Sequence, residues 1–196
     1  MNKALKSIIL SFSLITLVNL AFAQQLSTKS KQVKSAYSQL KERPDSKTYQ
    51  LNYISIFPSD TAQFLRVFAP PDFSQLNDGF DYIEGFFSLA KNHPVAVISK
   101  AVDIGKDLKW NADAVNYLQH GIVELGNKYT RLFIQKINSL NPKEQTNLIT
   151  FLADVENHHA YPEYKQLIRA INDAGEKGLA DQFTDAMHKR EKQPHD

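Results

Sequence analysis

Residues 111–140, NADAVNYLQHGIVELGNKYTRLFIQKINSL, contain the strongest periodic pattern in the chain. Apolar residues recur along it at steps of three and four, which is the spacing of one helix face. A continuous helix of about 28 residues would be roughly 42 Å long. Gly121 and Gly126 each weaken such a helix by about 1 kcal/mol relative to alanine, so a kink or break near Gly126-Asn127 is an alternative. We expect this segment to be the spine of the domain.

Proline and small polar residues mark where the neighbouring helices begin and end. Asn141 and Pro142 combine an amide cap with a proline at the first helical position, and Glu144 adds an acid that faces the helix dipole. Pro162 begins a further helix, which Gly175 ends in the left-handed cap position. The same reasoning predicts helices after Asp78, from His93-Pro94 and from about Lys177.

Residues 46–57, SKTYQLNYISIF, are ambiguous between strand and helix. Tyr49, Leu51 and Tyr53 alternate as in a strand, whereas Leu51 and Ile54 also fit one helical face. Because no second strand candidate exists to satisfy a lone strand's hydrogen bonds, we interpret the segment as a helix. Residues 60–63, DTAQ, have the sequence of a capping box and start the next helix.

Together these elements predict an all-α protein. We expect a single-domain array of about seven to eight helices, arranged as an irregular bundle or a stack of helical hairpins. No segment repeats at a fixed period. The expected organisation is a basic N-terminal helix or arm at 24–44, the all-α domain at 45–191 and a disordered tail at 192–196, with the charged run KREKQPHD at 189–196 expected to fray.

The first 23 residues have the composition of a secretory signal peptide. Two lysines precede an apolar run over residues 8–20, and Ala21 and Ala23 place small residues two apart before the expected cut. The run is about thirteen residues, shorter than the roughly twenty of a membrane span. The chain has no cysteine, which excludes disulfides, thiol catalysis and a lipid-anchored cysteine. We therefore expect an exported bacterial protein, periplasmic or secreted, with no transmembrane segment in the mature chain.

Charge is balanced once this leader is removed, with 21 basic and 21 acidic residues. Residues 24–44 nevertheless hold a basic surplus of four, because one acid, Glu42, accompanies five basic residues. Such a pattern is most often a solvated helix face, and the balanced total argues against nucleic-acid binding. The alternative function is binding of a polyanion or membrane surface through the basic residues Lys29, Lys31, Lys34, Lys41 and Arg43.

The stretch ADVENHHAYPEY, residues 153–164, gathers four candidate metal ligands, Asp154, Glu156, His158 and His159. Asp154 and His158 lie four apart. Glu156 and His159 have the Glu-x-x-His spacing by which one helix turn presents two ligands to a metal. Di-iron bundles need two such motifs and two further carboxylates, whereas this chain has the motif once. A metal-dependent protein or hydrolase using these residues is therefore kept as an alternative.

The same stretch is better interpreted as a helix end. Pro162 disfavours helical conformation at Tyr161, which places the two histidines at or past a final turn, where the helix dipole favours them. His120 and Glu124, one turn apart on the long helix, are expected to form a surface pair. The sequence contains no zinc-protease, nucleophile-elbow or phosphate-loop motif, so we assign no catalytic residue and expect no cofactor.

Aromatic residues offer a second candidate surface. Those in GFDYIEGFFSLA and KWNADAVNYL could line a groove for a ligand or a partner helix, although helical spacing more often indicates core. The partner-binding candidates are Phe80, Tyr82, Phe86, Phe87 and Trp110. Balanced charge, aromatic-bearing helices and the missing catalytic motifs favour a non-enzymatic helical module that binds a protein or envelope partner.

Overall fold

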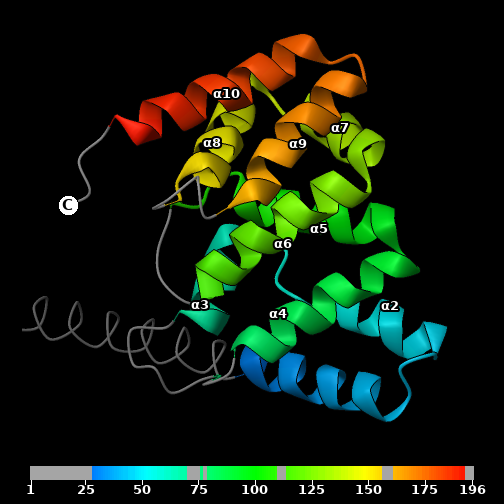
Figure 1. Ribbon diagram of the computed structural model, residues 1–196. Helices are drawn as coiled ribbons and strands as arrows, with labels where there is room; N and C mark the ends of the chain where they lie inside the picture. The colour runs from blue at the N-terminus through cyan, green and yellow to red at the C-terminus, as the bar shows by residue number, and fades with distance from the viewer. Residues whose placement is uncertain (1–27, 70–75, 77–78, 110–113, 156–160, 193–196) are drawn as a thin grey trace, which may run out of the picture.

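The computed structural model describes residues 28–69, 76, 79–109, 114–155 and 161–192. Within these ranges all regular structure is helical, which confirms the predicted all-α class. There are more helices than the seven to eight expected, partly because the predicted spine is two helices. The elements in Figure 1 are a helical segment at 28–42, α2 (Lys47–Ile56), α3 (Thr61–Phe68), α4 (Gly79–Ser88), a 3-10 turn η1 (Leu89–Lys91), α5 (Pro94–Gly105), α6 (Ala114–Lys128), α7 (Thr130–Asn138), α8 (Pro142–Ala153), α9 (Pro162–Asp173) and α10 (Lys177–Glu191).

Helix α6 is the centre of the fold and contacts α4, α5, α7, α8 and α9. The predicted spine is interrupted at Tyr129, whose φ and ψ of −126° and 45° leave the helical region. Gly126 remains within α6 and does not end the helix. A Cβ there would lie 2.7 Å from Leu167 Cδ1, so the glycine is needed for close packing. The Thr130 hydroxyl donates to the Asn127 carbonyl at 3.2 Å, so the break retains a hydrogen bond.

The start of α8 and the end of α9 lie where the sequence predicts. The Asn141 side chain accepts from the Glu144 N–H at 3.0 Å, and Glu144 accepts from the Asn141 N–H at 3.2 Å, which is a complete capping box. Gly175 has φ +92°, and the Glu176 N–H donates to the Ile171 carbonyl, as in a Schellman motif. Helix α10 then folds back on both α8 and α9 (Figure 1).

The basic helical segment 28–42 is packed on the domain. Val33, Ala36 and Leu40 are buried along one side of it. Its Tyr37 ring lies so close to α4 that a Cβ on Gly85 would be 2.4 Å from it. The thin apolar stripe is therefore a genuine packing seam, and the exposed side of the segment carries most of its charge.

Lys100 of α5 joins that helix to the end of α2, and Asp60 caps the start of α3. The Lys100 ammonium donates to the carbonyls of Phe57 at 2.7 Å and Ser55 at 3.2 Å, which caps the C-terminal end of α2. Asp60 caps α3 by accepting from the Gln63 N–H at 2.8 Å. The Gln63 side chain donates to the Asp60 carboxylate at 2.6 Å instead of accepting from its N–H, so only half of the predicted capping box forms.

The described helices include none with the length and apolar character of a membrane-spanning helix.

Candidate functional site

The stretch ADVENHHAYPEY begins at a helix end. Helix α8 finishes at Ala153, and Asp154 is its C-cap. The Asp154 carboxylate accepts from Arg190 Nε at 2.6 Å. Glu156, His158 and His159 lie outside the described residues, and within the described ranges no three His, Asp or Glu side chains are grouped so that they could hold a metal ion.

The ion pair of Asp154 with Arg190 corrects one expectation about the C-terminus. The sequence predicts fraying from Lys189, but α10 continues to Glu191 and brings Arg190 to the end of α8. Lys189 and Arg190 in the last turn of α10 favour this extension, because cationic side chains there face the negative end of the helix dipole. The basic residues at the end of α10 are the sequence signal for this extension, whereas the pairing of Arg190 with Asp154 depends on the tertiary fold.

The aromatic candidates are spread between core and surface. Phe86 is fully buried and stacks on Phe57 with ring centroids 4.0 Å apart. Phe87 and Tyr82 are partly buried and pack against the core. Phe80 is 47% exposed, with its ring edge-on to Tyr117 at 4.9 Å. Trp110 lies outside the described residues.

A shallow groove runs between α5 and α7. We call it the α5–α7 groove, and its volume is about 220 Å³. The lining residues are Val95, Ile98, Ser99, Leu132, Gln135, Lys136 and Ser139. Their spacing of three and four residues places them on one face of each helix, with the groove between the two faces. Ile98 is 1% exposed and belongs to the floor, whereas Val95 is 61% exposed at the N-terminal end of α5.

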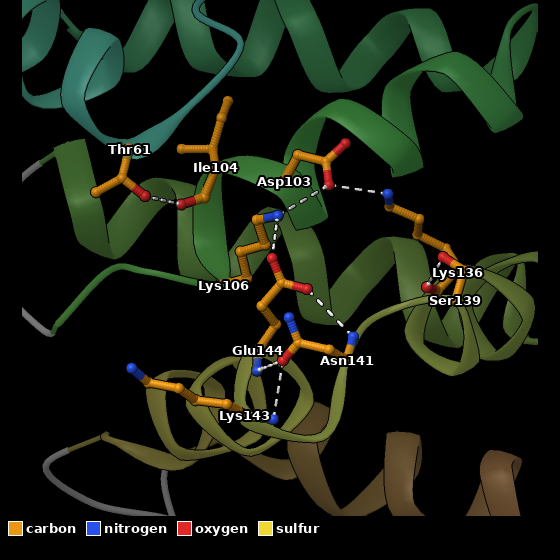
Figure 2. Close-up of polar contacts among 9 residues, drawn as sticks. All are labelled: Thr61, Asp103, Ile104, Lys106, Lys136, Ser139, Asn141, Lys143 and Glu144. Carbon is orange, nitrogen blue, oxygen red and sulfur yellow. Dashed lines mark hydrogen bonds and ion pairs between the residues drawn. The ribbon is translucent and has the colours of Figure 1, made fainter.

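One end of the groove is held by the ion-pair network in Figure 2. The Lys136 ammonium lies 2.8 Å from the Asp103 carboxylate and joins α7 to α5. Lys106 lies 2.6 Å from the Glu144 carboxylate, which joins α5 to the capping box of α8. The hydrogen bond from Lys106 holds the pKa of Glu144 below its usual range. The network fixes the positions of three helix ends, and none of its charges points to catalysis.

A second, smaller recess lies where α6 meets the end of α8 and the start of α9. We call it the Gln119 crevice, and its free volume is about 10 Å³. Gln119 is 1% exposed, and its amide nitrogen donates to the carbonyls of Phe151 at 2.6 Å and Asp154 at 3.1 Å. No donor in the described part of the chain reaches its Oε1. The crevice is lined by Gln119, His120, Val123, Leu152, Val155, Tyr161, Glu163 and Tyr164.

His120 lies in this crevice and not on an open surface. Its ring lies against Tyr161, with ring centroids 4.5 Å apart. Burial lowers the pKa of His120, although the charges of Glu163 and Glu124 act in the opposite direction. The imidazole is therefore neutral at pH 7, with one ring nitrogen able to accept a hydrogen bond. Glu124 contributes charge here, but the expected surface pair does not describe the environment of His120.

Most of the basic residues of the N-terminal segment lie on its outer side. Lys31, Lys34 and Lys41 are exposed, and Arg43 follows the helical segment in an exposed turn. Lys29 is less exposed, and burial lowers its pKa while the nearby Asp60 opposes that shift. The segment therefore presents a short cationic stripe beside its buried seam.

Comparison with protein-family models, curated proteins and solved structures gave no significant match to this chain.

Proposed function

We propose that this chain is an exported helical module that binds a segment of a partner protein in the α5–α7 groove. Export is supported by the leader-like composition of residues 1–23. Partner binding is supported by the groove itself, because two helix faces with an apolar floor are a common seat for a peptide segment.

The size of the groove favours binding of one side chain of a partner protein, which we call the anchor, over binding of a small molecule. Its volume of about 220 Å³ lies below the roughly 300–1,000 Å³ of typical small-molecule sites. Ile98 and Leu132 provide apolar floor and wall, and Val95 extends the apolar surface to the rim. A single exposed valine is ordinary on a protein surface, but here it continues a hollow. The anchor is therefore an aliphatic side chain.

The charge of the two helices indicates what flanks this anchor. Helix α7 contains Arg131 and Lys136 and no acidic residue. Helix α5 contains one lysine and one aspartate, and that aspartate is paired with Lys136. The charged residue in the groove lining is Lys136, and Arg131 is an exposed cation on the same helix, whereas Lys100 of α5 donates to carbonyls at the end of α2. An occupant with Asp or Glu beside its aliphatic anchor would be attracted to Lys136 and Arg131.

Selection from a random peptide library on the mature protein tests the proposal. We expect the enriched peptides to share an aliphatic residue flanked by acidic residues. Val95→Glu should abolish their binding, because it removes the apolar rim and adds a repelling charge. The variant should fold, since an acid in the first turn of a helix is favourable. Leu51→Glu on α2 is the matched control, because Leu51 is also exposed, at 44%, and lies outside the groove.

Substitutions at Gln135 test the effect of charge on peptide binding separately from the effect of groove shape. It is exposed on the groove wall, so either charge can be introduced there without burying it. Gln135→Lys should strengthen binding of the selected peptides and Gln135→Glu should weaken it, with both effects shrinking as salt rises. Equal binding by Val95→Glu and the unaltered protein, or enrichment of peptides without acidic residues, would contradict the proposal.

The cationic stripe of segment 28–42 favours a second candidate, association with a polyanion or an anionic membrane surface. Lys31, Lys34 and Lys41 share the exposed side of this helix. Deleting the segment would expose the core around Val33, so the test should replace the three lysines by glutamine. Binding to anionic lipid vesicles that falls with salt and disappears in this variant would support the candidate.

For the metal-dependent alternative, the one described ligand, Asp154, is already paired with Arg190.

A further inference from the structure

We propose that Tyr37 and Tyr82 form a modification site at which one-electron oxidation joins their two phenol rings by a carbon–carbon bond. This site is separate from the α5–α7 groove and does not depend on the function proposed above. Two observations carry the inference. The first is the contact between the two rings, and the second is the unequal access of solvent to the three tyrosines that cluster there.

The two rings come from different parts of the chain and lie in contact. Tyr37 belongs to the helical segment 28–42, and Tyr82 belongs to α4, which lies beside that segment (Figure 1). Their ring centroids are 4.8 Å apart, and their planes are inclined by 54°. Two rings joined by one carbon–carbon bond have centres separated by two ring radii and one bond length, which is slightly less than this distance. Bond formation therefore requires the rings to rotate more than to move together.

The hydroxyl ends of the two rings are neighbours, which matters because the carbons that couple lie next to the hydroxyl. Tyr37 Cε2 is one of these carbons, and it lies so close to α4 that a Cβ on Gly85 would overlap it. Tyr82 is three residues before Gly85 and therefore lies on the same side of α4. Burial raises the pKa of Tyr37, and the charges of Asp81 and Tyr82 raise it further. The Tyr82 hydroxyl is thus near enough to interact with that of Tyr37.

Tyr53 completes the cluster but is shielded from oxidation. Its ring centroid lies 5.5 Å from that of Tyr37, and its side chain is fully buried. Its hydroxyl donates to the Tyr82 carbonyl at 2.9 Å, and burial holds its pKa far above the ordinary value. A phenol must lose its proton when it is oxidised, and a backbone carbonyl is a poor base. Tyr37 and Tyr82 are partly exposed, so water can take their protons.

The other tyrosines do not offer a second phenol at this distance. Tyr117 lies against Phe80, and Tyr161 lies against His120. Within the described residues, the tyrosine rings in contact with one another are those of the cluster. Its two partly exposed members are therefore the pair that we assign.

The reaction balances with hydrogen peroxide as the oxidant and a peroxidase as its catalyst. Each phenol loses its hydroxyl hydrogen as one electron and one proton and becomes a radical. The radicals couple between one Cε carbon of each ring, and the hydrogen on each of these carbons then moves to the oxygen of its own ring. The peroxide accepts the two electrons and two protons and leaves as two water molecules. The protein gains a dityrosine and loses two hydrogen atoms.

The bond fastens segment 28–42 to α4. In the unmodified protein this segment is held by the apolar seam of Val33, Ala36 and Leu40, and a chain without cysteine cannot form a disulfide here. A cross-link between residues distant in sequence stabilises a fold by restricting the unfolded chain. The oxidised protein should therefore unfold at a higher urea concentration than the unmodified protein.

The test is oxidation of the full chain by a peroxidase and hydrogen peroxide at two protein concentrations, followed by trypsin digestion and mass spectrometry of the monomer. Trypsin cuts after lysine and arginine and gives peptides 35–41 and 67–91, each with one tyrosine. We expect these two peptides linked, at the sum of their masses less two hydrogen atoms. The yield should not depend on protein concentration. Dityrosine confined to dimers, or a linked pair that contains peptide 48–66 with Tyr53, would overturn the proposal.

Four variants that each replace one phenol by phenylalanine assign the bond. Tyr37→Phe and Tyr82→Phe keep the rings but should remove dityrosine fluorescence from the monomer and abolish the rise in the urea midpoint. Tyr53→Phe should still form the cross-link, as should Tyr117→Phe, a partly exposed tyrosine outside the cluster. Persistent monomer fluorescence in Tyr37→Phe or Tyr82→Phe would overturn the assignment, and so would its loss in Tyr53→Phe.

Discussion

In the N-terminal half of the molecule ring packs on ring, whereas in the C-terminal half aliphatic side chains fill the space between capped helices. Phe57 stacks on Phe86 and also contacts Tyr53 and Phe68. Tyr53 in turn contacts Tyr37, so the first four helical segments share one aromatic cluster. Around α8 to α10 leucine and isoleucine are the most frequent core residues, with Phe151, Tyr164 and Phe183 buried among them. Rings need particular angles and clearances, and aliphatic side chains pack more tolerantly. The N-terminal half should therefore be more sensitive to changes of shape at constant hydrophobicity.

The largest effect is expected from removing a stacked ring. Phe86→Ala should lower the free energy of unfolding by about 3–5 kcal/mol, because it empties a fully buried site. In a double-mutant cycle of Phe57→Leu and Phe86→Leu, the rings should show a coupling of about 0.5–1.5 kcal/mol. Urea denaturation measures all four proteins. A coupling of zero would mean that the two halves do not differ in the way described.

The next largest effect on stability is expected where a glycine lies too close to a neighbouring side chain to accept a Cβ. A Cβ on Gly121 would lie 2.1 Å from the Phe87 ring, so Gly121→Ala should destabilise the protein by about 1–3 kcal/mol. Phe87→Leu should recover part of this loss in the double variant. Gly178→Ala on α10 has open space around its Cβ and should instead stabilise by about 0.5–1 kcal/mol. Equal effects at the two glycines, measured by urea denaturation, would contradict the packing described between α4 and α6.

Helix capping should have a smaller effect, concentrated where a cap is observed. Asn141→Ala removes the side-chain half of the capping box of α8, while the backbone N–H of residue 141 can still donate to Glu144, and should lower the free energy of unfolding by about 1 kcal/mol. Ser46 precedes α2 without a side-chain cap hydrogen bond, so Ser46→Ala should change stability by only a few tenths of a kcal/mol at most. Thermal unfolding at one pH compares the pair, and a larger loss at Ser46 would contradict the account.

A pH dependence is expected at Lys100. Burial lowers its pKa to about 8, with Lys29 as a neighbouring cation. Between pH 8 and its unfolded pKa of roughly 10.4, the unfolded chain holds more protons at this position, so stability should rise with pH. The free energy of unfolding of the unaltered protein, minus that of Lys100→Met, should therefore increase from pH 7.5 to 9.5. Buried Tyr53 and Tyr164 have raised pKa values and oppose this trend at higher pH, so the comparison stops there.

The contrast between the halves also explains what could be predicted from the sequence. The start of α8 at Asn141 and the end of α9 at Gly175 were predictable, because caps are local. The break at Tyr129 was not placed correctly, since Gly126 serves packing against Leu167 and does not end the helix. The Gln119 acceptor was missed, because an unpartnered oxygen is visible only when its surroundings are known. The α5–α7 groove was missed as well, since both of its helices read as ordinary amphipathic segments.

The proposed occupant of the α5–α7 groove is an aliphatic anchor flanked by acidic residues. Methyl NMR of the protein, with a selected peptide added, is the decisive test of this proposal. We predict saturable shifts for the methyl groups of Val95, Ile98 and Leu132, none for Leu51 on α2, and weaker binding as salt rises. Shifts at Leu51 or around Phe80 with an unchanged groove would contradict the claim and place partner binding on another face.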